Sequence, residues 1–314
     1  MQADSPLVVW RLRDGTPGHE KQTEGFIQAM NQRTNAVVEE FTWPLERNKL
    51  MAKWRKGRQA GPDLIVGAGH GVHLAMLASR TFCGGRTVVL MKPTLPLWLF
   101  DLALVPEHDQ CPDRANVLRT EGMLCPVLDL PKDVQAGLIL LGGESRHFDW
   151  DSQAVTQAVE RIIDQRQDFH WQVGNSRRTP AELQALLTLP ERARWVDYRE
   201  CAADWLKQAL AEASEVWVTA DSASMVYEAM SSGAVVGIIE LGNHAADDKL
   251  AQGIAKLVAR GWVLRSSAQD DPPLGQAVYP ISDLTSDPIV RPLREHLRCV
   301  DVVLRRWFPG RAQV

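Results

Sequence analysis

The sequence predicts an α/β protein of two domains, in which parallel strands alternate with helices. Short β-branched runs, typical of strands buried on both faces of a sheet, recur along the chain and are followed by helical stretches. The 314 residues are enough for about two domains. The pattern also starts twice, because a strand leading into a glycine-containing loop opens each half, near residues 7–18 and 137–143. We therefore expect two Rossmann-like domains that face each other across a cleft.

The composition is that of an ordinary globular protein, with 45% hydrophobic and 24% charged residues. A net charge of −4 gives no overall attraction to nucleic acid or membranes, so a membrane contact requires a local patch and no nucleic-acid partner is expected. Five cysteines lie apart without CxxC spacing, which is typical of reduced cytosolic thiols and argues against a metal site. There is no signal-peptide pattern and no apolar run near the ~18 residues of a spanning helix. We expect a cytoplasmic protein without a metal or cofactor.

The first domain, expected at residues 1–134, opens with a strand at 7–10, a loop at 14–22 and a helix that continues through residues 26–30. The loop lacks both GxGxxG and the ending of a P-loop, so neither class of nucleotide cofactor is predicted. Its polar residues His19, Glu20 and Gln22 could point into a ligand site, because ligands of open α/β sheets bind at the carboxyl ends of strands. For His19, a solvated loop position is an equal alternative.

Two more polar residues, His108 and Asp109, follow the predicted strand at 100–106. They are close enough in sequence to act as a base and its orienting carboxylate. Adjacent residues often point apart, however, so the spacing alone does not establish a pair.

A basic segment at residues 47–58 contains six basic residues and no acid. Leu50, Met51 and Trp54 form an apolar stripe at helical spacing. A basic amphipathic helix with a tryptophan can rest on an anionic membrane surface. The alternative is a solvated helix that packs this stripe into its own domain.

The second domain, expected at residues 135–285, carries two polar strand ends. A strand at 137–141 runs into Gly142-Gly143-Glu144-Ser145, and a strand at 171–174 runs into a loop containing Ser176, Arg177 and Arg178. Two guanidinium groups beside hydroxyls suit a diphosphate, because they pair bidentately with its oxygens. A surface loop with solvated arginines is the alternative.

A strand, polar turn and helix at residues 216–230 form the centre of this half. Asp221, Ser222 and Ser224 fall where the helix should start, and their oxygens can cap its amides. The same free amides can hold a phosphate. Glu228 falls about two turns into the helix, where a carboxylate can accept hydrogen bonds from the vicinal hydroxyls of a ribose. An ordinary capped αβ unit is the alternative. A last helix, within residues 286–314, is expected to pack back on the first domain.

Six short motifs carry a resemblance to a known family. They are Gly18-His19-Glu20-Lys21-Gln22, Pro62-Asp63-Leu64-Ile65-Val66, Phe100-Asp101-Leu102 with Pro106 and His108-Asp109, Leu141-Gly142-Gly143, Ser176-Arg177-Arg178-Thr179-Pro180, and Val218-Thr219-Ala220-Asp221-Ser222 with Met225 and Glu228-Ala229. Over about residues 7–265 the sequence resembles the plant elongated-mitochondria fission proteins and their bacterial relatives, a family related to GT-B glycosyltransferases. The family pattern has asparagine in place of Lys21 and histidine or serine at position 19, which shifts weight from His19 to Glu20 and Gln22.

The resemblance implies a two-domain GT-B fold with a nucleotide-sugar site in the C-terminal half. Glu228 matches the place of a glutamate that binds the donor ribose in GT-B enzymes, whose sugar transfer usually needs no metal. The implied donor-binding residues are Gly143, Ser145, Ser176, Arg177, Arg178, Asp221, Ser222, Ser224, Glu228 and His244. The candidate bases are, in order, Glu20, Asp109, His19 and His108, with Gly18 and Gln22 on an acceptor-side loop.

The expected function is therefore a glycosyltransferase that moves a sugar from a nucleotide-sugar to a glycolipid or glycan of the cell envelope. It would work in the cytoplasm, peripherally on the inner membrane face through residues 47–58. A non-catalytic adaptor of the fission-factor type is one alternative, since the plant relatives are discussed as fission factors. A sugar-nucleotide epimerase is another, because one class of epimerases shares the two-domain plan.

Overall fold

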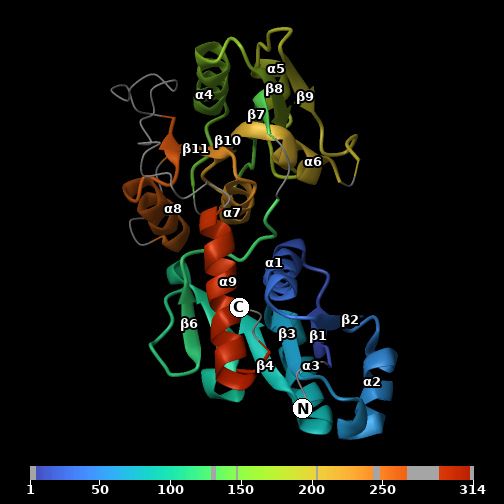
Figure 1. The fold of residues 1–314 in the computed structure, drawn as a ribbon. Coiled ribbons are helices and arrows are strands. Elements are labelled where there is room, and N and C mark those ends of the chain that lie inside the picture. The colour runs from blue at the N-terminus through green and yellow to red at the C-terminus, as the bar shows by residue number, and fades with distance from the viewer. Residues whose placement is uncertain are drawn as a thin grey trace. The chain divides into compact units, whose positions relative to one another are not determined.

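The chain divides into two structural units (Figure 1). Unit 1 comprises Met1–Pro126 and Pro292–Val314, and unit 2 comprises Val127–Arg291. The computed structural model describes residues 5–128, 132–145, 148–202, 204–242, 248–266 and 290–311. His244, one of the expected donor-binding residues, lies outside the described residues.

Unit 1 is built on a six-stranded sheet in which every pair of neighbours is parallel. Its strands are β1 (Leu7–Arg13), β2 (Ala36–Thr42), β3 (Leu64–Ala68), β4 (Arg86–Leu90), β5 (Leu102–Pro106) and β6 (Val117–Thr120), in the order β2-β1-β3-β4-β5-β6. From β1 the chain moves outward to β2 and then returns to the other side of β1 for β3. The strand order therefore reverses between β1 and β3, and in such sheets ligands bind at that point.

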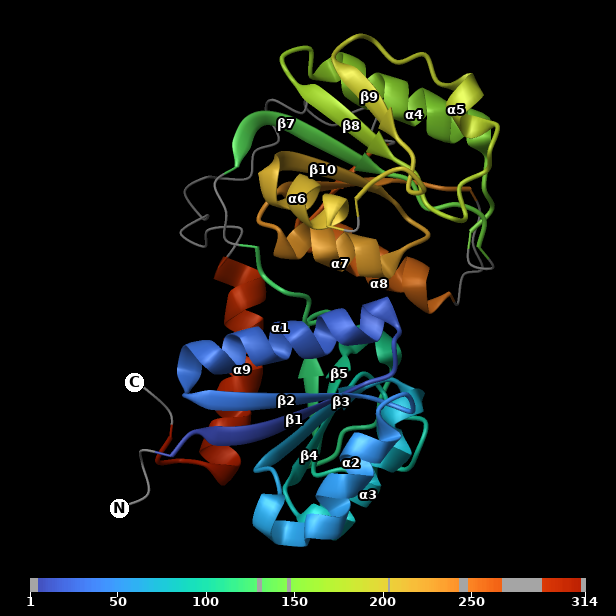
Figure 2. The same ribbon diagram turned by 90° about the vertical axis from the view of Figure 1, so that its right-hand side faces the viewer.

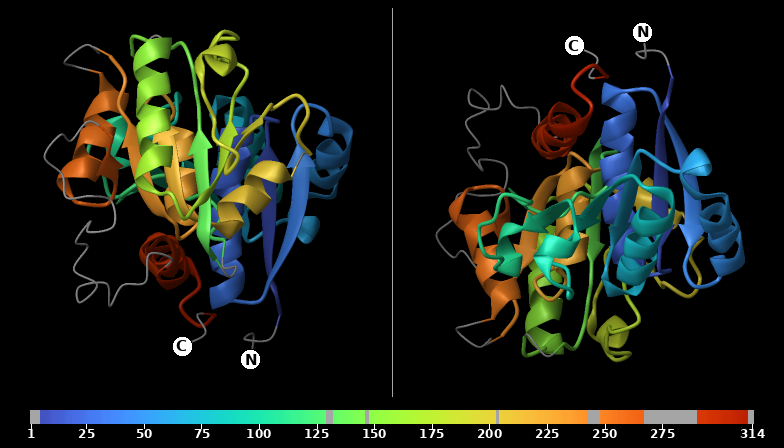
Figure 3. Two further views of the ribbon diagram at one scale, coloured as in Figure 1. Left: turned by 90° about the horizontal axis from the view of Figure 1, so that it is seen from above. Right: turned by 90° about the horizontal axis from the view of Figure 1, so that it is seen from below.

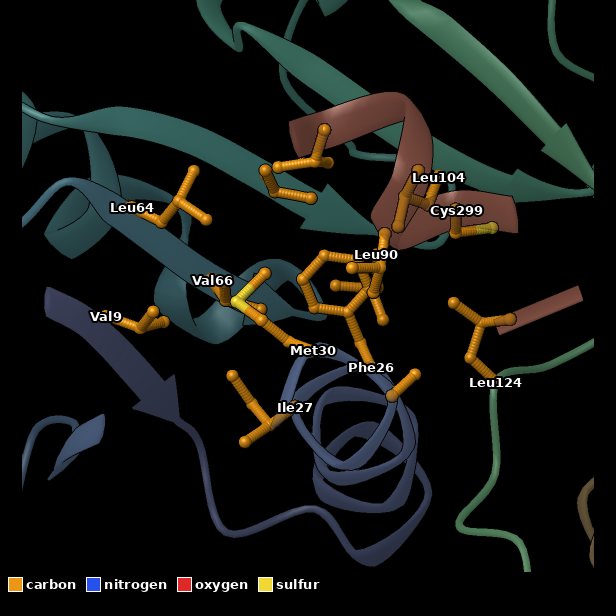
Figure 4. Close-up of a cluster of buried hydrophobic side chains, with 14 of the residues drawn as sticks. Val9, Phe26, Ile27, Met30, Leu64, Val66, Leu90, Leu104, Leu124 and Cys299 are labelled. Carbon is orange, nitrogen blue, oxygen red and sulfur yellow. The ribbon is translucent and has the colours of Figure 1, made fainter. Parts of the chain in front are cut away.

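Helices cover both faces of this sheet (Figure 2). Helices α1 (Pro17–Arg33) and α9 (Val290–Trp307) pack on one face, and α2 (Arg47–Lys56) and α3 (His73–Cys83) pack on the other. Phe26 and Met30 of α1 share a hydrophobic cluster with Cys299 of α9 and with strand residues such as Val66 and Leu90 (Figure 4). Helix α9 thus belongs to the core of unit 1. Short 3₁₀ turns, η1 (Gly57–Ala60), η2 (His70–Val72), η3 (Leu97–Leu99) and η4 (Glu107–Asp109), complete the unit.

Unit 2 has a second six-stranded parallel sheet with the order β12-β11-β10-β7-β8-β9. Its strands are β7 (Asp133–Leu140), β8 (His170–Gly174), β9 (Ala193–Val196), β10 (Ala213–Thr219), β11 (Val235–Ile239) and β12 (Leu264–Arg265). Helices α4 (Ser152–Gln165) and α5 (Leu183–Leu186) lie on one face, and α6 (Trp205–Glu212), α7 (Ala223–Ser231) and α8 (Lys249–Ala259) on the other (Figures 2 and 3). Read from β9, this is the order 3-2-1-4-5-6 of nucleotide-binding sheets, and it reverses between β7 and β10. The expected α/β class with two Rossmann-like domains is confirmed.

In the sheet of unit 2, two tryptophans lie opposite glycines on the neighbouring strands. Gly137 pairs with Trp171, and Gly237 pairs with Trp217. A Cβ atom at either glycine would lie 2.4 Å from the indole ring of its partner, closer than van der Waals contact allows. The absent side chains therefore let two large rings lie flat against the sheet.

Asp101, which belongs to one of the motifs, has a structural role. Its carboxylate joins the start of β5 to the start of β4, because Oδ2 accepts hydrogen bonds from the amide and the hydroxyl of Thr87, each at 2.9 Å. Arg80 and Arg86 pair with the same carboxylate at 3.3 and 3.2 Å. Burial alone would raise the pKa of Asp101, but the Thr87 hydrogen bonds and the two guanidinium groups hold it below its usual value.

We expect Asp101→Asn to lower the free energy of unfolding by about 1–2 kcal/mol at pH 7. A carboxyl with a depressed native pKa contributes stability that is complete above its unfolded pKa, near 3.8, and is lost as the pH falls through the native pKa. The difference between wild type and variant should therefore shrink as the pH falls below about 4. Urea unfolding at pH 7 and pH 3 measures it, and a difference that stays constant would contradict this role.

Candidate functional site

The candidate ligand edge of unit 2 lies where its strand order reverses. Strand β7 ends next to Gly142 and Gly143, β8 leads into the loop with Ser176, and β10 leads into Asp221. Since β8 and β10 flank β7 on either side, these three loops meet at one edge of the sheet. The structure thus brings together most of the expected donor-binding residues of unit 2.

A buried carboxylate joins the three loops. The Asp221 side chain is 0% exposed, and its Oδ2 accepts a hydrogen bond from the amide of Gly143 at 3.1 Å and forms an ion pair with Nη2 of Arg178 at 2.6 Å. Within the described residues, its Oδ1 has no hydrogen-bond partner. A Cβ at Gly142 would lie 2.1 Å from Oδ2, so only glycine lets the carboxylate approach this backbone. Asp221 therefore holds the strand ends together and does not cap α7, whose N-cap is Ser222.

The loop after β8 is locked onto the end of β7 by its own polar side chains. The hydroxyl of Ser176 donates to the carbonyl of Gly142 at 2.7 Å, and that of Thr179 donates to the carbonyl of Leu141 at 3.0 Å. Arg178 adds Nη1 contacts of 3.4 and 3.3 Å to the carbonyls of Gly143 and Glu144. A Cβ at Gly143 would lie 1.9 Å from the carbonyl oxygen of Arg178. Ser176 and Arg178 are thus engaged within the protein.

The two neighbouring arginines differ in their surroundings. Arg178 is bound to Asp221 although 43% of its side chain is exposed. Arg177 is exposed and makes no hydrogen bond or ion pair with any residue that the structure describes. Arg177 is therefore the guanidinium that is available to an anionic ligand.

The start of α7 offers amides to the same edge. Ser222 makes no side-chain cap, and its hydroxyl lies 3.5 Å from that of Ser224. The first amides of a helix have no partner within it, and the positive helix end attracts anions. Glu228, further along α7, and Ser145, after β7, are both half-buried and both contact other parts of the protein.

In unit 1, an aspartate and a histidine form a pair where the strand order reverses. Asp14 follows β1, and its Oδ2 lies 2.8 Å from Nδ1 of His19 in the first turn of α1. The other carboxylate oxygen accepts a hydrogen bond from the amide of Thr16 at 3.0 Å. Gly69, after β3, packs against the imidazole so closely that a Cβ there would lie 2.1 Å from Nδ1. The loops after β1 and β3 thus fix both members of the pair.

The charge of Asp14 determines which nitrogen of His19 can act as a base. Burial would raise the pKa of Asp14, but hydrogen bonds from His19 and Thr16 lower it below its usual value. The carboxylate is therefore ionised at neutral pH and can only accept a hydrogen bond. In the neutral imidazole of His19, the proton therefore lies on Nδ1, and Nε2 can accept a hydrogen bond.

The family of the protein follows from its sequence. A sequence model of the family described as mitochondrial fission ELM1 matches residues 17–307. The chain belongs to this family. No match is found among curated protein sequences.

Several solved structures resemble this ELM1-family protein over nearly the whole chain. A putative UDP-N-acetylglucosamine 2-epimerase from Listeria monocytogenes has a TM-score of 0.58 and 12% identity, covering 96% of this chain and 97% of that one. The UDP-GlcNAc 2-epimerase from Neisseria meningitidis bound to UDP-GlcNAc has a TM-score of 0.57 and 11% identity, covering 95% and 100%. The glycotransferase of kitacinnamycin has a TM-score of 0.52 and 14% identity, covering 96% and 99%. The ELM1-family chain therefore has a GT-B-like fold, shared by glycosyltransferases and epimerases.

The other candidate bases of the ELM1-family chain have different surroundings. The carboxylate of Glu20 forms an ion pair with Arg13, so a guanidinium occupies it. His108 and Asp109 follow β5, but Nε2 of His108 lies 3.9 Å from Oδ1 of Asp109, beyond hydrogen-bond distance. Gln22 lies on α1 and is buried. Gly18 lies beside open space, because a Cβ atom there would have no neighbouring atom within 4 Å.

Asp14 was not among the residues singled out from the sequence. The helix begins at Pro17, so His19, Glu20 and Gln22 lie on α1 and not on an extended loop as expected. The one available signal was an acidic residue directly after the first strand, ahead of a histidine in the same segment. Nothing in the local pattern shows that their side chains meet.

The basic segment forms α2 and the start of η1 and turns Leu50 and Trp54 of its apolar stripe inward, whereas Met51 is 37% exposed. Leu50 is fully buried, and Nε1 of Trp54 donates to the hydroxyl of Ser79 on α3 at 2.9 Å. Trp54 also stacks on Phe82, with ring centroids 5.6 Å apart. Of the two interpretations of this stripe, packing into its own domain is the one observed for Leu50 and Trp54. None of the helices in the described part of the chain is long and apolar enough to span a membrane.

We expect the two arginines to respond differently to substitution. Arg178→Met removes the partner of a buried carboxylate and should lower the free energy of unfolding by about 1–3 kcal/mol, reduced from a fully buried pair because Arg178 is partly exposed. Arg177→Met should leave it unchanged within about 0.5 kcal/mol. Urea unfolding of both variants makes the comparison, and equal losses would contradict the assignment.

Proposed function

We propose that this ELM1-family protein is a glycosyltransferase that moves a sugar from a nucleotide-sugar donor to a glycolipid or glycan acceptor of the cell envelope, without a metal ion. The observation that carries the proposal is the edge of unit 2 where its strand order reverses. There Arg177 and the first amides of α7 lie on the loops that flank the end of β7. A diphosphate is the ligand that such an edge suits, because both features attract anions and neither is neutralised among the described residues.

The role of each residue in binding the donor follows from the hydrogen bonds and ion pairs that it can still make with a ligand. Arg177 and the amides after Ser222 would hold the diphosphate, and Ser224 would add a hydroxyl. Glu228 would accept hydrogen bonds from the ribose. The three loops would be held in place by Asp221, Arg178, Ser176, Gly142 and Gly143. The solved structure of the Neisseria epimerase with UDP-GlcNAc supports a uridine nucleotide as the first donor to test.

Unit 1 would supply the base. Nε2 of His19 takes the proton of an acceptor hydroxyl while the hydroxyl oxygen bonds to the anomeric carbon of the sugar. The bond from that carbon to the diphosphate breaks, and the nucleoside diphosphate leaves with both electrons. Arg177 and the helix end stabilise the negative charge that develops on the leaving phosphate. Asp14 stabilises the imidazolium and returns the ring to the same tautomer after the proton is released.

The cellular setting is part of the same proposal. A glycolipid acceptor lies in the cytoplasmic membrane, so the protein would work in the cytoplasm and bind the inner membrane face peripherally. The family is described by its role in mitochondrial fission. An adaptor without catalysis would not need the polar residues that lie where the strand order reverses in unit 1 and in unit 2. An epimerase would bind its sugar nucleotide at the same edge of unit 2 but would need no acceptor. The assays below separate these three functions.

We expect a nucleoside diphosphate to raise the melting temperature of the purified protein. At a ligand concentration of about 100 Kd the stabilisation is about 2.7 kcal/mol. UDP, GDP and CMP should be titrated in parallel. Arg177→Met should weaken binding about 10- to 100-fold, because a charge-assisted hydrogen bond contributes about 1.5–3 kcal/mol. Arg161→Met, an exposed position on the outer side of α4, is the control. No shift with any nucleotide would contradict the donor site.

We expect His19→Asn to keep nucleotide binding and to lower sugar transfer about 10²- to 10⁴-fold, as removal of a general base does. Asp14→Asn should lower transfer less, and Glu20→Gln least. The assay measures nucleoside diphosphate released from the sugar nucleotide, with and without a lipid-linked acceptor. Formation of an epimeric sugar nucleotide, or release of its nucleotide to water, that needs no acceptor would indicate the epimerase, and turnover that depends on Glu20 but not on His19 would overturn the assigned base.

A further inference from the structure

Residues 47–100 are far more basic than the rest of the chain. They contain nine lysines and arginines and a single acidic residue, Asp63, in a protein whose net charge is −4. This stretch runs through α2, η1, β3, α3, β4 and η3. Its helices cover one face of the unit 1 sheet, the face with the cluster around Leu50, Met76 and Phe100. The charge is therefore concentrated on one side of unit 1.

Part of this charge is neutralised and part is free. Lys49 pairs with Glu46, Lys53 with Glu39, and Arg80 and Arg86 with Asp101. In α2 and η1, the exposed residues without an ion pair among the described residues are Arg47, Arg55, Lys56 and Arg58. Lys92, which is also exposed, donates to the carbonyl of Gln110 at 2.9 Å. Four cations that are held on a short stretch of rigid helix make a surface for a polyanion.

The same side of unit 1 exposes large apolar side chains. Leu74 and Phe82 of α3 are 71% and 54% exposed, Trp98 of η3 is 76% exposed, and Leu45, just before α2, is 85% exposed. Helix α3 contains no acidic residue, and its single charged side chain, Arg80, is paired with Asp101. An amphipathic surface helix normally presents polar residues to water. Of the exposed residues of α3, which are Leu74, Thr81 and Phe82, only Thr81 is polar.

The apolar and basic groups adjoin each other. Phe82 stacks on Trp54 of α2, and α2 and α3 lie side by side on this face (Figure 2). Leu97 and Leu99, on either side of Trp98, pack into the same cluster as Leu50. Trp98 therefore projects from the side of the sheet that α2 and α3 cover.

We propose that this side of unit 1, with Arg47, Arg55, Lys56, Arg58, Leu45, Leu74, Phe82 and Trp98, is the contact surface for an anionic lipid bilayer. The cations face the lipid phosphates, and the tryptophan and phenylalanine enter the boundary between headgroups and acyl chains. A nucleic acid would use the cations and can stack a base on Trp98 or Phe82, but it would gain nothing from the isolated leucines Leu45 and Leu74. The apolar contact comes from α3 and η3, because Leu50 and Trp54 of the basic helix face inward. This inference rests on the peripheral membrane binding of the proposed function, but not on the nucleotide-binding edge of unit 2 or on His19.

The test is sedimentation of the full chain with lipid vesicles. The protein should bind vesicles of phosphatidylcholine mixed with phosphatidylglycerol, should not bind phosphatidylcholine alone, and should dissociate as salt is raised. The double variant Arg55→Glu with Lys56→Glu should bind at least about tenfold more weakly. Trp98→Ser with Leu74→Ser should do the same at unchanged charge. Thermal melting of each variant checks that it remains folded.

Matched controls lie in unit 2. Arg161→Glu with Lys207→Glu changes the charge equally at exposed positions, and Val134→Ser removes an exposed apolar side chain. Both should bind vesicles like the wild type. The proposal is overturned by equal binding to neutral vesicles, by controls that lose as much affinity as the test variants, or by a Trp98 and Leu74 variant that binds normally. The last result, together with binding of an oligonucleotide through Arg55 and Lys56, would identify a polyanion site in place of a membrane surface.

Discussion

The buried carboxylate of Asp221 is the constraint on which the candidate donor edge depends. A charge with no exposed surface is stable only when it is paired and hydrogen-bonded, and the pairing here comes from two other loops. The amide of Gly143 and the guanidinium of Arg178 therefore have to lie beside β10. Glycine is required at positions 142 and 143 because backbone or carboxylate atoms occupy the space of a side chain. One buried side chain thus fixes the ends of three strands.

The pair formed by Asp14 and His19 plays a similar part in unit 1. A carboxylate after β1 orients an imidazole on α1, and Gly69 after β3 leaves room for the ring. In both units the polar cluster lies where the strand order reverses and neighbouring loops diverge. A parallel sheet provides this opening whatever its side chains are. The side chains at that opening then decide which chemistry is available, which is why glycosyltransferases and epimerases can share the fold.

Local sequence contained enough information for the fold. The β-branched runs, the glycines after strands and the helical stretches predicted two α/β domains, and the motifs predicted the family, both of which the structure and the comparisons confirm. These features are local, since burial on both faces of a strand or along one face of a helix shows directly in the order of residues. The start of α1 was less evident: a loop rich in glycine and polar residues concealed a helix that begins at Pro17.

Tertiary structure decided the direction of each polar side chain, and with it the candidate site. Arg177 and Arg178 are indistinguishable in the sequence and both are exposed, yet Arg177 has no ion pair among the described residues and Arg178 binds a carboxylate far away along the chain. Gly143 and Asp221 are 78 residues apart, and no local pattern predicts their hydrogen bond. The same holds for Leu50 and Trp54, which could equally have faced a membrane. Sequence alone determined which elements form, because periodicity and turn residues are local. Which charges are buried, paired or left free depended on the meeting of distant strands.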